Sequence, residues 1–303
     1  MTDPSLVIAW LLLAHLLGDF VFQTERMAVD KFGDGRRAWS ALAAHAAVVG
    51  VTLAPVVAVF GVRGVLFLAV SVLTHLVVDR LKVVLTRRAD AAAMRAARRA
   101  DAPDAPAATL GAAWTPLPGA LFIVDQLVHI AVLLGAWLVL LADAVPLDWV
   151  VRITDLVRGP LDETVFHQVV LTAVVVADLL IVNVRAAALF VGTLVEPQEA
   201  VTSEPQQERQ ADDAAAGRVG MASPARLGAT IGVLERLVVV ALVLAGQAAA
   251  IGLVVAAKTL ARFKQLDDRR FAEYYLLGTL ASVAVALISG LIAVAVLGAI
   301  LRR

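Results

Sequence analysis

The chain has 303 residues, of which 60% are hydrophobic, 6% aromatic and 17% charged, and its mean hydropathy is +0.84. This composition is too apolar for a soluble globular protein, so we expect an all-α, polytopic transmembrane helical bundle. Lys and Arg number 26, as do Asp and Glu, so no net charge would attract nucleic acid. The chain contains no cysteine, which excludes disulfides, thiolate metal sites and thiol nucleophiles.

Several apolar stretches are long enough to cross a bilayer, whose core of about 30 Å requires roughly 20 mostly apolar residues per helix. The first stretch is short and contains His15 and Asp19, so a half-inserted first segment stays open as an alternative. We therefore expect about seven spans, with six as the alternative. The predicted spans are 4–23, 39–60, 64–86, 119–142, 164–195, 229–257 and 274–301.

Composition also divides the chain into four parts. Residues 1–142 form a four-helix membrane module, and residues 143–195 contain an interfacial helix and the fifth span. Residues 196–228 are rich in Glu, Gln, Asp, Ala and Gly, which is typical of an acidic disordered linker. Residues 229–303 form a C-terminal two-span hairpin.

The distribution of Lys and Arg predicts the orientation. The loops after the first and third spans hold nine of these residues and the loop between them only Arg63, so the two basic loops are predicted to be cytoplasmic. Abundant Ala, and Arg in excess of Lys, indicate a GC-rich bacterial genome and hence the bacterial cytoplasmic (inner) membrane. The basic segment 258–273 does not fit this orientation, because seven crossings would place it on the side of the membrane opposite the cytoplasm. Either one of the predicted spans does not cross the membrane, or partners bury the segment 258–273.

Ionisable residues inside the predicted spans are regularly spaced. Each costs about 2.5 to 3.5 kcal/mol on insertion scales and therefore requires a reason. In three spans a His and an Asp are four residues apart, which places both on one helical face. The order is reversed in the span that runs the opposite way, so each Asp is predicted to lie nearer the cytoplasm than its His. The pairs are His15 with Asp19, His75 with Asp79, and Asp125 with His129, and His45 is predicted at a similar depth.

Imidazole and carboxylate without thiolate form the ligand set of Zn, Mn or Fe, and there are enough candidates for one or two divalent ions. Coordination would neutralise the carboxylates inside lipid, and an open ligand position would activate water for hydrolysis. We expect a hydrolase acting on a phosphate or acyl bond of a lipid or other membrane-presented substrate, with Asp19, Asp79 or Asp125 as a general base. The predicted ligands are His15, Asp19, His45, His75, Asp79, Asp125 and His129, and the predicted substrate-binding residues are Gln23, Lys82 and Gln126.

Other interpretations of this pattern stay open. Buried His and Asp pairs can tie membrane helices together. His and Asp chains also relay protons, so an ion- or proton-coupled transporter is the main functional alternative. A non-catalytic membrane scaffold would instead use the acidic linker and the charged segment 258–273 as docking surfaces. The matched depth of the three pairs and of His45 favours a metal or proton-handling site over simple pairing.

The same positions carry a resemblance to a known family. The chain resembles the bacterial membrane family catalogued as domain of unknown function 3307 over about residues 6–130. Glu235, Arg236 and the block 258–279 are similar to an extension of longer members. The resemblance implies a membrane module and no particular activity. Its motif is His15xxxAsp19xxxGln23, Lys31, His45, His75xxxAsp79xxLys82 and Asp125-Gln126xxHis129.

Overall fold

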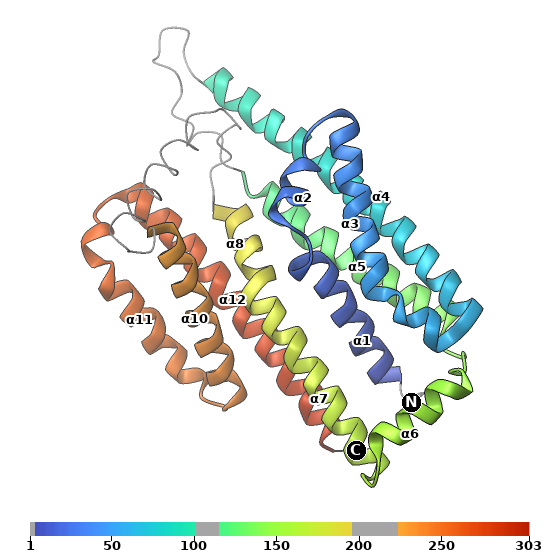
Figure 1. Ribbon diagram of the computed structural model, residues 1–303. Helices are drawn as coiled ribbons and strands as arrows, with labels where there is room; N and C mark the ends of the chain where they lie inside the picture. The colour runs from blue at the N-terminus through green and yellow to red at the C-terminus, as the bar shows by residue number, and fades with distance from the viewer. Residues whose placement is uncertain (1–3, 101–114, 196–223, 303) are drawn as a thin grey trace, which may run out of the picture. The chain divides into compact units, whose positions relative to one another are not determined.

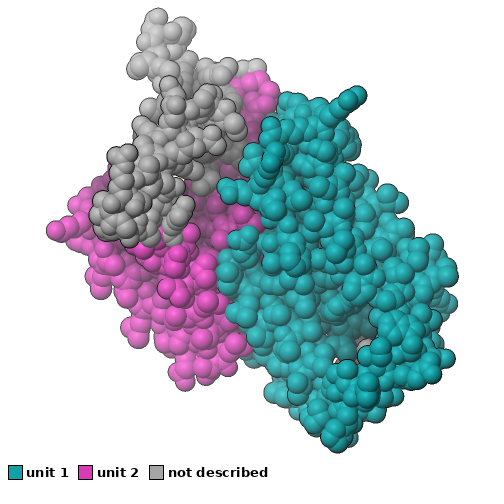
Figure 2. Space-filling view, in the orientation of Figure 1, with its two compact units in different colours: residues 1–87, 120–185, 292–303 teal, residues 88–119, 186–291 magenta. Residues whose placement is uncertain are grey.

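The computed structural model describes residues 4–100, 115–195 and 224–302. Throughout these residues the regular structure is helical, without strands, which confirms the all-α class (Figure 1). Six described helices are long and apolar enough to cross a membrane. The chain divides into two compact units (Figure 2). Unit 1 contains residues 1–87, 120–185 and 292–303, and unit 2 contains residues 88–119 and 186–291.

Unit 1 begins with α1 (Pro4–Leu16), which continues directly into the π-helical turn η1 (Leu17–Val21). Together they are long enough to span a membrane, so the first segment has the length of a full crossing. The short helix α2 (Glu25–Asp30) follows, and the side chain of Thr24 caps it by accepting from the backbone N of Met27 at 3.2 Å.

The next three helices complete the front of unit 1. Helix α3 (Gly35–Leu53) is shorter than the predicted span 39–60 and begins with a basic turn, and it is not among the six long apolar helices. Helix α4 (Pro55–Ala100) has a kink at Gly61 and includes the whole of the third predicted span. Helix α5 (Leu117–Leu140) matches the fourth.

An apolar core holds these four helices together. Leu11 of α1, Val49 and Leu53 of α3, and Phe67 of α4 are almost completely buried against each other, and Leu133 of α5 joins them. Large apolar side chains on the outward faces are exposed in contrast, which is the pattern of helices that face lipid. Examples are Val51, Leu73, Val77 and Leu138, each more than 60% exposed.

Helix α6 (Asp148–Arg158) lies where the interfacial helix was expected, and only Val150 on it is buried. The fifth span is continuous but consists of α7 (Glu163–Ile181), the π-turn η3 (Val182–Ala186) and α8 (Ala187–Val195). Of the predicted acidic linker, residues 196–223 lie outside the described residues, and the remainder belongs to the next helix.

The segment 229–257 was predicted as one span, and the structure shows a helical hairpin instead. Helix α10 (Pro224–Leu244) ends at a turn in which Gly246 has a φ of 70°. This left-handed conformation favours glycine. The turn η4 (Ala248–Ala250) then leads into α11 (Ile251–Ala261), which runs back beside α10 (Figure 1).

This hairpin accounts for the basic segment that conflicted with seven crossings. Because α11 returns toward the end where α10 begins, the segment 258–273 lies on the side from which the hairpin enters. The turn η5 (Phe263–Gln265) and helix α12 (Arg269–Ile300) follow, and α12 contains the last predicted span. The segment 229–257 is therefore not one continuous span, and seven crossings no longer follow from it.

Candidate metal centre

The seven predicted His and Asp ligands meet inside unit 1. They come from α1 with η1, α3, α4 and α5, four elements that are far apart in sequence. Every one of them is between 1% and 6% exposed, although charged groups inside proteins are rarely buried unless they are paired or bound. The residues are His15, Asp19, His45, His75, Asp79, Asp125 and His129.

A π-helical turn places Asp19. Such turns add a residue to a helical turn and are frequent at functional sites. A Cβ atom at Gly18 would lie 3.0 Å from Val49 Cγ2, so the glycine allows η1 to approach α3 closely. Arg185 Nε donates to the carbonyl oxygen of Phe20 at 3.1 Å and so satisfies a backbone group of this turn. The local sequence thereby brings Asp19 toward α3.

Three polar atoms of the cluster lie 3.0 to 3.5 Å from one another, and two of the three distances match the spacing of ligands of one ion. Asp19 Oδ1 lies 3.5 Å from His45 Nε2 and 3.4 Å from His75 Nε2. The two Nε2 atoms are 3.0 Å apart. In a tetrahedral site with N and O ligands, neighbouring ligand atoms are about 3.3 to 3.6 Å apart. Asp79 Oδ2, 3.5 Å from His45 Nε2, is a fourth candidate atom.

His129 has the arrangement of a metal-binding imidazole. Its Nδ1 donates to the carbonyl oxygen of Asp125 at 2.9 Å, which leaves the lone pair on Nε2. A backbone carbonyl commonly fixes the tautomer of a metal ligand in this way. The Nε2 atom is buried and has no hydrogen-bond partner within residues 4–100, 115–195 and 224–302. Groups that are able to hold an ion include His129 with Asp79 and Asp125, and His15 with Asp19 and His75.

Gln126 connects the two ends of the cluster. Its Nε2 donates to Asp19 Oδ2 and to Asp125 Oδ2, both at 3.1 Å. Its Oε1 accepts from His15 Nε2 at 3.2 Å. Gln126 was expected to bind substrate, and the structure places both of its polar atoms on the predicted ligands. The arrangement gives Gln126 the geometry of a residue that positions carboxylates.

Two lysines, Lys31 buried and Lys82 partly buried, neutralise two of the three carboxylates. Lys31 Nζ donates to Asp79 Oδ2 at 2.8 Å, and Lys82 Nζ donates to Asp125 Oδ2 at 2.7 Å. Lys82 was a predicted substrate-binding residue, whereas Lys31 was expected in a basic loop and as part of the family motif, without a role in the site. Lys31 is 5% exposed and was missed as a site residue, because its partner lies 48 positions away and no local spacing connects them.

The remaining predicted substrate-binding residue, Gln23, lies in the bend after η1 and is half-buried. Gln23 follows Asp19 by four residues, and the π-turn and the helix end at Val21 interrupt the regular helical register between them. Its role in substrate binding stays a prediction.

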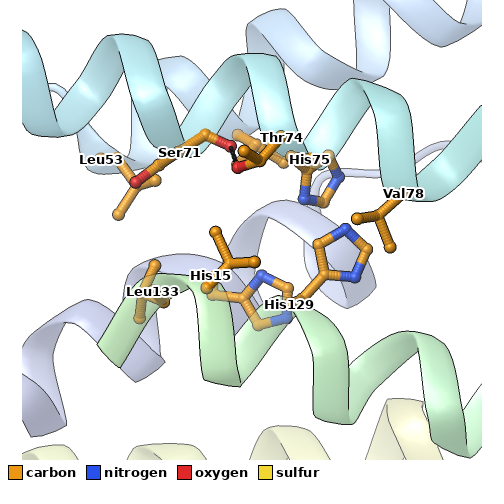
Figure 3. Close-up of a pocket in the computed structure, with 10 residues that line it drawn as sticks. His15, Leu53, Ser71, Thr74, His75, Val78, His129 and Leu133 are labelled. Carbon is orange, nitrogen blue, oxygen red and sulfur yellow. Dashed lines mark hydrogen bonds between the residues drawn. The ribbon is translucent and has the colours of Figure 1, made fainter. Parts of the chain in front are cut away.

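A pocket lies directly beside the imidazoles (Figure 3). His15, His75 and His129 face it, together with the hydroxyl-bearing Ser71 and Thr74. Its other lining is apolar. The His and Asp cluster therefore borders a small cavity next to the imidazole edges. The apolar lining residues are Val49, Leu53, Val78, Val132 and Leu133.

Fold and site together define a polytopic α-helical membrane protein whose first module encloses a buried His and Asp cluster. Residues 7–156 match the family described as Protein of unknown function (DUF3307), so the front half of the chain belongs to that family. The match confirms the resemblance found over residues 6–130 and extends it into helix α6. No curated protein and no solved structure matches the chain.

Proposed function

We propose that the cluster in unit 1 binds one divalent metal ion and that the protein is a metal-dependent hydrolase of the bacterial inner membrane. The observation that carries the proposal is the convergence of Asp19 Oδ1, His45 Nε2 and His75 Nε2 at 3.0 to 3.5 Å from one another. The N and O donor set without thiolate fits Zn, Mn or Fe.

The charge balance of the cluster supports this proposal. Three carboxylates face two lysine ammonium groups, so the cluster carries one excess negative charge when its imidazoles are neutral. An excess charge is costly inside a membrane protein and calls for a compensating ion. Before any bound anion is counted, one divalent ion would leave the cluster with one positive charge and two ions with three. The balance therefore favours one ion over two.

The contacts then suggest two roles for residues of the cluster, metal ligand and general base. Asp19, His45 and His75 would hold the ion, with Asp79 or His129 as a further ligand. An ion with an open position supplies water that is activated near neutral pH. Asp125, buried and positioned by Lys82, is the candidate general base. The substrate bond would be presented at the cytoplasmic leaflet.

Metal analysis of the full-length protein tests the proposal. The chain would be expressed with Zn, Mn and Fe supplied, purified in detergent, and measured by plasma mass spectrometry. We expect about one ion per chain in the wild type and a loss of most of it in His75→Ala. His167→Ala is the matched control, because His167 is the one histidine outside the cluster and lies in α7. A folded wild type without stoichiometric metal would overturn the metal proposal.

Hydrolysis is tested separately on metal-loaded protein. Phospholipid and acyl-ester substrates in mixed micelles would be assayed for released phosphate or fatty acid. We expect turnover that Asp125→Asn lowers by about 100-fold or more, since general bases contribute about that much. Metal bound without turnover of either bond class would remove the hydrolase part of the proposal and leave the metal site.

Proton-coupled transport is a second candidate, and the imidazole rings favour it. Their centroids form a chain, with 5.0 Å from His45 to His75, 4.2 Å from His75 to His129 and 5.4 Å from His129 to His15. A single proton on one ring would also balance the excess charge. Proteoliposomes with a pH-sensitive dye would show transport that Asp79→Asn abolishes. Absence of any proton flux would exclude this candidate.

A further inference from the structure

Arg185, a residue outside the matched family region, contacts the turn that carries a predicted metal ligand. Its Nε donates to the carbonyl oxygen of Phe20 in η1 at 3.1 Å, and the two residues are 165 positions apart in the sequence. Both belong to unit 1. The residue before Phe20 is Asp19, whose Oδ1 lies 3.4 to 3.5 Å from two imidazoles of the cluster. The family match ends at residue 156, so the turn η3 that contains Arg185 lies beyond the matched module.

The position of Phe20 at a helix end explains why a donor from another helix bonds its carbonyl group. The π-turn η1 ends at Val21, and the last carbonyl groups of a helix have no amide partner within it. The backbone bond that closes this turn runs from Phe22 N to Leu17 O at 2.9 Å. A guanidinium at this end also meets the negative end of the helix dipole. The bond from Arg185 is therefore favourable both as a hydrogen bond and through its charge.

Two apolar contacts hold η1 on its other sides. The side chain of Phe20 is 4% exposed, and its ring centroid lies 6.1 Å from that of Phe122 in α5. At Gly18 the turn approaches α3 closely. Apolar contacts have no preferred direction, whereas a hydrogen bond has one. Of these three contacts, the bond from Arg185 is thus the one that can fix the rotation of the turn and with it the direction of the Asp19 side chain.

The fifth span places Arg185 at this end of η1. Helix α7 packs along α1, and Leu171 of α7 and Ala9 of α1 are buried in one apolar cluster (Figure 1). The helix then widens into the π-turn η3, which contains Arg185. Asn183 in the same turn is 0% exposed, and its Nδ2 donates to the carbonyl oxygen of Leu179 at 2.9 Å. This bond stabilises the wider turn, in which the regular backbone pairing of an α-helix is interrupted.

We propose that Arg185 is a positioning residue of the metal centre, which fixes the backbone of η1 so that Asp19 faces His45 and His75. The proposal rests on the metal site proposed above, because Asp19 is one of its ligands. Arg185 acts through the backbone of η1 and not as a ligand, since a guanidinium group stays protonated and has no lone pair to offer a metal. The fifth span is thereby part of the site, although the family match does not include it.

Titration of the full-length protein with Co²⁺ tests this role, because the visible absorption of Co²⁺ reports the ligands around it. Arg185→Met removes the donors and the charge. It should weaken Co²⁺ binding by about tenfold or more and change the spectrum, since hydrogen bonds to charged groups are of that strength. Arg185→Lys keeps a charged donor within reach of the same carbonyl oxygen, so its affinity should stay within about threefold of the wild type. Arg63→Met is the matched control, because the Arg63 side chain is 50% exposed and pairs with Asp143 in the same unit.

Hydrogen exchange of the metal-free protein separates this proposal from the metal proposal. In Arg185→Met the amides of residues 17–22 should exchange about tenfold faster or more, because η1 loses a charge-assisted bond. A wild type that binds no metal would remove the metal proposal, and exchange alone would then decide whether Arg185 holds η1. Unchanged exchange would overturn the proposal, as would faster exchange with unchanged Co²⁺ affinity and spectrum. Should Arg185→Met not fold, Arg185→Lys decides, since retained binding and exchange support the proposal and their loss contradicts it.

Discussion

The two polar clusters of this protein differ in how their charged groups are partnered. The cluster in unit 1 has three carboxylates, two ammonium groups and four imidazoles, so its excess is negative. The pocket among α10, α11 and α12 in unit 2 is lined by the two cations Arg236 and Lys258 and by one carboxylate, and that carboxylate, of Glu235, is in contact with Lys258. Where water cannot screen a charge, an excess predicts the class of ligand. A cation is expected in the cluster of unit 1.

The largest expected effect comes from breaking a buried ion pair in unit 1. Lys31 and Asp79 are in contact at 2.8 Å, with side chains 5% and 2% exposed. In metal-free protein, Lys31→Met should lower the free energy of unfolding by about 3 to 5 kcal/mol, because it leaves a buried carboxylate without its partner. Thermal unfolding followed by tryptophan fluorescence in the presence of EDTA measures the change.

The double variant Lys31→Met with Asp79→Asn provides the control for that prediction. It removes both charges and should recover most of the lost stability. Added metal should also stabilise Lys31→Met more than the wild type, since the cation meets a larger negative excess. Wild-type stability of Lys31→Met in EDTA would contradict the charge balance given for unit 1.

The next effect concerns the close approach of η1 to α3. A Cβ at Gly18 would lie 3.0 Å from Val49 Cγ2 and 3.2 Å from Thr52 Oγ1. Gly18→Ala should therefore move Asp19 away from His45, lower stability by about 1 to 3 kcal/mol and weaken metal binding. Gly135→Ala in α5 is the matched control, because no atom lies within 4 Å of its added Cβ. Equal metal affinity of the two variants would show that Gly18 does not position the site.

A smaller effect is expected in the hairpin of unit 2. Gly246 has a φ of 70°, so Gly246→Ala should cost about 1 to 2 kcal/mol of stability. Gly252→Ala in α11, where the added Cβ meets no atom within 4 Å, should be neutral or slightly stabilising. Thermal unfolding of both variants provides the comparison. A neutral Gly246→Ala would argue against the tight turn between α10 and α11.

The smallest effect is expected at an exposed ion pair of unit 1. Arg87 Nη1 donates to Asp34 Oδ1 at 2.7 Å and holds the pKa of that carboxyl below its usual value. A lowered pKa contributes stability at neutral pH that is lost as the pH falls through the folded value. Solvent screens this pair, so Asp34→Asn should leave the melting temperature unchanged within error. A large loss would mean that exposed pairs matter as much as the buried clusters.

The sequence predicted those parts of the site that depend on local periodicity. A spacing of four identified three pairs among the converging residues, since i and i+4 share a helical face. The pairs are His15 with Asp19, His75 with Asp79, and Asp125 with His129. The spacing could not identify Lys31, because the contact of Lys31 with Asp79 joins the loop after α2 to helix α4. It also placed Gln23 on a helical face that the π-turn interrupts.

The fold was predictable to a similar extent. Apolar length identified most of the spans, because a membrane requires it. The hairpin of α10 and α11 was missed because the turn around Gly246 lies in a run of small, weakly polar residues that resembles a continuous apolar helix. The division of the chain into four parts at residues 142, 195 and 228 stays a prediction.

X-ray absorption spectroscopy of the metal-loaded protein tests the central claim most directly, because it reports the atoms around the ion. The account predicts a shell of N and O atoms at about 2.0 to 2.2 Å that includes at least two imidazoles. His75→Ala should lose one of them. A shell of oxygen atoms alone, without imidazole scattering in the wild type, would contradict the assignment of Asp19, His45 and His75 as the metal centre.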